Sequence, residues 1–135
     1  MNTPDNLVSL VVQILTIGAN RPAGLSILDH ESLPLGKDEL PATCVYLTED
    51  RPADERYVDG PQWREAVINV EIRAAGPVLS GTKPLRDWVI PLVLGLELPN
   101  ITIGLTGFHP FGEMLDFQMA GAVLEFTFRY LWSNP

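Results

Sequence analysis

Residues 63–75 read WREAVINVEIRAA, and this stretch decides the fold because its side chains alternate between two chemistries. One set of alternate positions is apolar: Ala66, Ile68, Val70 and Ile72. The other set is polar or charged: Glu65, Asn69, Glu71 and Arg73. Successive side chains of a β-strand point to opposite faces of the sheet. The period of two therefore predicts a strand that carries the apolar set on one face and the polar set on the other.

Three further segments have the composition of strands. Residues 42–49, ATCVYLTE, are rich in β-branched and aromatic side chains, and apolar residues on both faces indicate an inner strand. Residues 105–115 and 121–132 are predicted to form two more strands, separated by a turn near residues 116–120. In the last strand the large apolar side chains share one face: Leu124, Phe126, Phe128, Tyr130 and Trp132.

Two amphipathic helices are predicted, over residues 4–17 and 83–96, because their apolar residues recur at the spacing of one helical face. Thr3 and Thr82 are the expected N-caps, since a hydroxyl can accept a hydrogen bond from an unpaired amide of the first turn. Pro91 lies inside the second helix and should kink it or end its regular hydrogen bonding.

The predicted order of elements is helix, strand, strand, helix, strand, strand. Strands that follow one another through short links favour antiparallel pairing. We therefore expect an α+β fold, with two main helices packed on a mixed, mainly antiparallel four-stranded sheet. The length of 135 residues fits a single domain over residues 1–135. Residues 19–41 are expected to be irregular, because five prolines and glycines interrupt any long period.

The composition narrows the class of partner. Seventeen acidic and nine basic side chains give a formal net charge of −8, and such a surface repels phosphate backbones. Sequence-specific binding to nucleic acid is thus disfavoured. No apolar run approaches the length of a membrane span, and the amino terminus lacks the basic region of a secretory signal. We expect no contact with a membrane.

No catalytic motif emerges from the sequence. Gly-rich phosphate loops and the GxSxG motif are absent. Cys44 could pair with a histidine as a nucleophile, but its apolar neighbours favour a buried structural role. His109 is interpreted as a packing or interface residue rather than a base. Asp29, His30 and Glu31 could converge on a metal ion, although such triplets are more often solvated turns. We predict a protein that is not an enzyme and needs no metal or cofactor.

A charged loop of about a dozen residues separates the strands at 42–49 and 63–75. It has two readings, a solvated loop or a contact between subunits, since a loop with charges of both signs can pair with a neighbour. The candidate interface residues in it are Asp50, Arg51, Asp54, Glu55, Arg56 and Asp59.

Several segments together resemble the tail terminator family of lambda-like, long-tailed bacteriophages. The run ELPATCVYLTED at residues 39–50 is similar to a family segment, and the charged loop and Trp-initiated strand follow it in the same order. A helix with an L-x-x-W signature, here Leu85 to Trp88, and a later proline, Pro91, come next. An aromatic-alternating strand, LEFTFRYLW, then ends close to the carboxyl terminus. Residues 99–119 and the link before the second helix do not fit the pattern.

The resemblance implies a structural subunit that forms a homohexameric ring at the head-proximal end of the virion tail. Such a ring caps the tail tube, ends polymerisation of the tube protein and presents the surface that joins the head–tail connector protein. It is assembled in the host cytoplasm, and genome DNA passes through its lumen without specific binding. A negative lumen would suit that passage, because it repels phosphates.

Two other classes remain open from the sequence. The first is another phage neck, head–tail completion or tube-related protein, which could share a similar core. The second is a small α+β ligand-binding or enzymatic domain, which requires a concave pocket with convergent polar groups.

Overall fold

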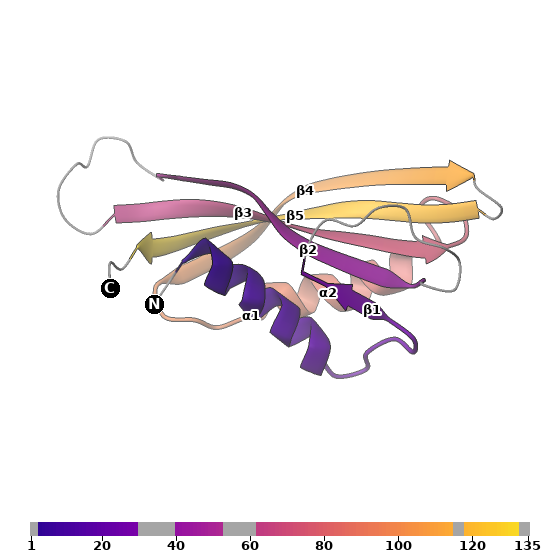
Figure 1. Cartoon of the computed structure of the whole chain (residues 1–135), viewed down its shortest axis with the longest axis horizontal. Helices are drawn as coiled ribbons and strands as arrows, with labels where there is room; N and C mark the ends of the chain where they lie inside the picture. The colour runs from indigo at the N-terminus through magenta and orange to yellow at the C-terminus, as the bar shows by residue number, and fades with distance from the viewer. Residues whose placement is uncertain (1–2, 30–39, 53–61, 115–117, 133–135) are drawn as a thin grey trace.

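The computed structural model describes residues 3–29, 40–52, 62–114 and 118–132. This part of the chain contains two helices and five strands (Figure 1). Their bounds are α1 Pro4–Ile17, β1 Ser26–Leu28, β2 Ala42–Pro52, β3 Gln62–Ala75, α2 Lys83–Leu94, β4 Ile101–Met114 and β5 Gln118–Trp132. The fold is α+β, as predicted.

The strands form one mixed sheet in the order β1-β2-β3-β5-β4. β1 pairs parallel to β2, whereas every other neighbouring pair is antiparallel. The prediction of four strands is therefore wrong by one, and the order of elements is α-β-β-β-α-β-β. Ser26–Leu28 fell within the stretch predicted to be irregular, because three residues are too few to show a period of two.

The four predicted strands are present, with shifted ends. β2 continues beyond residue 49 to Pro52, so the start of the predicted charged loop is strand. β4 starts at Ile101 rather than at residue 105, and β5 starts at Gln118 rather than at 121. Both differences lengthen the β4–β5 hairpin, which pairs from Ile101 opposite Tyr130 to Met114 opposite Gln118 with one bulge at Thr106.

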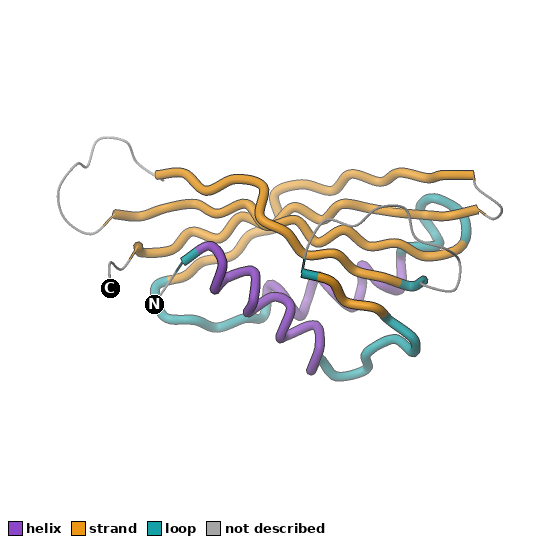
Figure 2. The backbone as a smooth tube through the Cα atoms, viewed as in Figure 1, coloured by secondary structure: helices purple, strands orange, loops and turns teal. Residues whose placement is uncertain are grey.

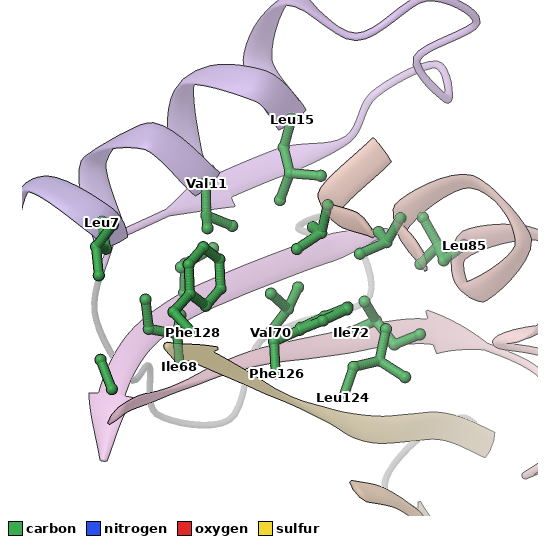
Figure 3. Close-up of a cluster of buried hydrophobic side chains, with 14 of the residues drawn as sticks. Leu7, Val11, Leu15, Ile68, Val70, Ile72, Leu85, Leu124, Phe126 and Phe128 are labelled. Atoms are coloured by element: carbon green, nitrogen blue, oxygen red, sulfur yellow. The ribbon is translucent and has the colours of Figure 1, made fainter. Parts of the chain in front are cut away.

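Both helices lie on the same face of the sheet (Figure 2). Leu7, Val11 and Leu15 of α1 are fully buried, and they point toward the sheet (Figure 3). The residues that receive them come from β3 and β5: Ile68, Val70, Ile72, Leu124, Phe126 and Phe128. Removing a side chain of this size from water stabilises a fold by about 1.5–3 kcal/mol. The alternation of residues 63–75 is thus explained by this one apolar layer.

The helix ends agree with the sequence only in part. Thr3 caps α1 as predicted, because its hydroxyl oxygen accepts a hydrogen bond from the amide of Asn6 at 3.3 Å. Thr82 makes no such capping bond; its backbone is already helical and its hydroxyl donates to the carbonyl of Leu79 at 3.4 Å. Pro91 does not end α2, which continues to Leu94. Pro91 and Asp87 are both exposed, so the carbonyl that loses its amide partner is close to solvent.

The two helices meet at the end of α1. The indole N–H of Trp88 donates to the carbonyl of Ala19 at 2.8 Å, across 69 positions of sequence. A Cβ at Gly18 would lie 2.7 Å from the side chain of Leu92, so a larger residue here would displace that side chain. This contact fixes where α1 ends relative to the second helix.

Replacement of Phe126 by alanine is expected to lower the free energy of unfolding by about 3–5 kcal/mol, because it opens a cavity between the sheet and the helices. Urea denaturation followed by circular dichroism measures the change. Ile17→Ala is the matched control, since Ile17 is 69% exposed, and it should change stability by less than about 0.5 kcal/mol. Equal effects at the two positions would contradict this assignment of the core.

Candidate subunit interface

The paired ends of β2 and β3 extend past the start of α1 (Figure 1). This end of the sheet carries the two predicted interface residues that the structure places, Asp50 and Arg51. The other four, Asp54, Glu55, Arg56 and Asp59, lie outside the described residues.

A bulge in β2 determines which of these side chains turns inward. Leu47 pairs with Ile68 and Glu49 with Val67, so Thr48 is the extra residue. Its hydroxyl donates to the carbonyl of Val67 at 3.1 Å. Strict alternation from Leu47 would have placed Glu49 on the helix-covered face, but the bulge shifts the pattern by one residue. As a result Asp50 faces the helices.

Asp50 is engaged inside the subunit. Its carboxylate accepts a hydrogen bond from the hydroxyl of Tyr130 at 2.8 Å and forms an ion pair with the guanidinium of Arg64 at 3.1 Å. Burial, with the hydrogen bond to Asp50 as a second cause, raises the pKa of Tyr130 to about 12. The hydrogen bond to Asp50 also raises the pKa of Arg64. The three side chains join β2, β3 and β5 at the end of the sheet, so Asp50 has a structural role here.

Arg51 lies on the opposite face of β2 and is exposed. Its guanidinium contacts Glu49 at 2.8 Å and Glu65 at 3.3 Å. The bond to Glu49 is the main reason that the pKa of Arg51 is raised. The predicted patch is therefore divided, because Asp50 and Arg51 point to different faces. Arg51 remains accessible to a partner, whereas Asp50 is held by its own chain.

The second face of the sheet is not covered by a helix in the described part of the chain. Glu65, Asn69, Glu71 and Arg73 lie on it, as the alternation predicts. Arg73 forms a buried ion pair with Glu71 at 2.8 Å, and its guanidinium carbon lies 5.8 Å from the centre of the Phe111 ring.

Further along this face, paired side chains from neighbouring strands contact one another. The guanidinium carbon of Arg129 lies 5.3 Å from the centre of the Trp63 ring, and the hydroxyls of Thr106 and Thr127 are 2.8 Å apart. The sequence identified the polar character of this face, but these contacts depend on the register between strands and could not be read from it.

The residues considered for chemistry are not brought together. Cys44 is fully buried, as predicted from its apolar neighbours. The ring of His109 is largely exposed, 3.7 Å from the carboxylate of Glu125, and is not packed inside the chain. Of the possible metal triplet only Asp29 lies within the described residues, and there it is exposed. Within the described residues no three His, Cys, Asp or Glu side chains gather in the arrangement of a metal site.

An apolar cavity of about 390 Å³ lies at the other end of the helix layer. The described residues that line it offer no charged or hydrogen-bonding side chain: Pro22, Leu40, Pro41, Ala74, Ala75, Gly81, Pro84 and Leu85. Ligand sites usually combine an apolar wall with a few polar groups that orient the ligand. This cavity shows only the first of those features among its described residues.

No helix in the described part of the chain has the length and apolar character needed to span a bilayer. Comparison with protein-family models and with curated protein sequences gives no match.

The raised pKa of Tyr130 leads us to predict that the free energy of unfolding falls at high pH. Its pKa of about 12 in the folded chain lies above the ordinary value of 10, so folding favours the protonated hydroxyl. This contribution is complete below pH 10 and is lost as the pH rises toward 12, by up to roughly 2–3 kcal/mol. Tyr130→Phe should show a smaller fall in the free energy of unfolding over that range.

Urea denaturation between pH 9 and 12 measures the difference. Tyr46→Phe is the control, because Tyr46 lies on the opposite face of β2 and its loss leaves the Asp50 carboxylate in place. A Tyr130→Phe variant whose alkaline fall equals that of the wild type would contradict the assignment.

Proposed function

We propose that this chain is a tail terminator of a long-tailed bacteriophage, a structural subunit that forms a homohexameric ring on the end of the tail tube. The proposal rests on the positions, in the fold, of the segments that resemble the tail terminator family. Four of the segments that resemble the family form principal elements, namely β2, β3, α2 and β5. Together these elements supply most of the sheet and half of the helix layer.

The individual motif residues support the proposal because they hold those elements together. Val45 of the first segment is fully buried in the core. Trp88, which ends the L-x-x-W signature, joins the two helices through its bond to Ala19. Phe126 and Phe128 of the aromatic strand fill the layer between sheet and helices. The resemblance thus rests on residues that hold the sheet and the helices together.

The charge of the chain fits the proposed position in the virion. A net charge of −8 per subunit is consistent with a negative lumen, which would repel the phosphates of DNA and let the genome pass without specific binding. The proposed partners are other copies of the chain, the tail tube protein and the head–tail connector protein. The proposed location is the head-proximal end of the tail, after assembly in the host cytoplasm.

The nearest alternative is another neck, head–tail completion or tube-related protein, because these could share the same core. The two functions are distinguished by locating the protein in the virion, that is, by finding which end of the tail carries it. A ligand-binding domain receives less support, since the described lining of the 390 Å³ cavity lacks polar groups that would orient a ligand.

Association of the purified chain should increase with salt. Like charges on copies of net charge −8 repel one another, and ions screen that repulsion over a distance of about 10 Å at 0.1 M. Light scattering should show the average mass rising from that of the 14.9 kDa monomer as salt is added. Negative-stain images of the associated fraction should show rings with a central hole. A monomer at every salt concentration, both alone and mixed with tail tubes, would overturn the proposal.

A further inference from the structure

The outer edge of β4 is long and has no strand beside it in the described part of the chain. β4 is the last strand in the order of the described sheet, where it pairs with β5. Figure 1 shows β4 at the margin of the sheet over its whole length. The backbone groups on this edge are available to another strand.

This edge lacks most of the features that keep exposed strands from pairing with other chains. From Ile101 to Gly112 it carries no Asp, Glu, Lys or Arg, although nearly a fifth of the whole chain is charged. Leu105 and Phe108 are 39% and 37% exposed. Arg86 covers part of the Phe108 ring. Two features interrupt the edge, namely the bulge at Thr106 and the proline Pro110. Natural edges of this length are usually protected by charges or covered, so we expect a partner strand here.

The opposite side of the sheet offers a second open edge. β1 pairs only with Ala42 to Cys44 of β2. Residues 47–52 of β2 therefore have no strand on their outer side in the described part of the chain. Because the order is β2-β3-β5-β4 with each pair antiparallel, β2 and β4 run in opposite directions. A second copy placed beside the first in the same orientation would thus bring its β2 antiparallel to β4.

We propose that β4 of one subunit pairs antiparallel with residues 47–52 of β2 of the next subunit, so that copies of the sheet join head to tail. This inference rests on the proposed ring and names the contact that would build it. A contact between two different edges can close into a ring, whereas β4 paired with β4 would stop at a dimer. Charge favours the mixed contact, because two β2 edges would bring Glu49 of both copies together, while β4 has no Asp, Glu, Lys or Arg from Ile101 to Gly112.

Disulfide cross-linking tests this contact directly. Glu49 and Thr102 lie on the same face of the sheet, on β2 and β4, and Gly104 on that face has open space where a side chain would extend. Glu49→Cys, Thr102→Cys and Gly104→Cys are made as separate proteins, and opposing strands place such side chains within disulfide reach. The wild type, whose Cys44 is buried, is one control. Arg129→Cys is the other, because it lies on the same face but on a central strand.

We expect no cross-link from any of the three variants alone, and a linked dimer when Glu49→Cys is oxidised with Thr102→Cys or Gly104→Cys. A chain carrying both changes should give a ladder of linked products. Thr102→Cys or Gly104→Cys linking to itself would overturn the inference in favour of a symmetric dimer. Rings in the microscope without any cross-link would overturn it while leaving the proposed function intact. If neither rings nor cross-links form, in salt or with tail tubes, both proposals fail.

Discussion

The fold depends on the burial of one face of the β3–β5 ladder beneath two helices. These strands pair without interruption from Gln62 opposite Trp132 to Ala75 opposite Met119. One set of their alternate side chains forms the apolar layer against α1 and α2 (Figure 3). Because the period of a strand is two, burying this set places Glu65, Asn69 and Glu71 on the other face. The division of the molecule into an apolar helix side and a polar sheet side follows from that single constraint.

The bulge at Thr48 shows how a local irregularity changes the face of the sheet to which a charged side chain points. In a regular strand Glu49 would turn toward the helices and Asp50 would point to the opposite face. With the bulge, Asp50 meets Arg64 and Tyr130 and closes the end of the sheet, while Glu49 joins Arg51 on the open face. A half-buried carboxylate that is satisfied by a guanidinium and a hydroxyl belongs to the internal structure. Arg51, Glu49 and Glu65 form their ion pairs on the exposed face at the same end.

The sequence predicted the features that have a period and missed those that depend on register. The core faces of β3 and β5, the bounds of α1 and its Thr3 cap follow from local patterns and were found as expected. β1 was too short to show alternation. The inward turn of Asp50 could not be foreseen, because no residue type marks the bulge. The bond from Trp88 to Ala19 joins positions 69 apart, and the sequence showed that tryptophan only as part of a family signature.

The same limit applies to the candidate interface. Its two described members, Asp50 and Arg51, are neighbours in sequence but point to opposite faces, and only the pairing of β2 with β3 reveals this. The central claim, that the chain caps a tail tube, is tested most directly by the lengths of tubes grown from tail tube protein. With the chain present, electron micrographs should show tubes that stop growing and carry a ring at one end. Tubes that keep lengthening as they do without it, with bare ends, would contradict the account.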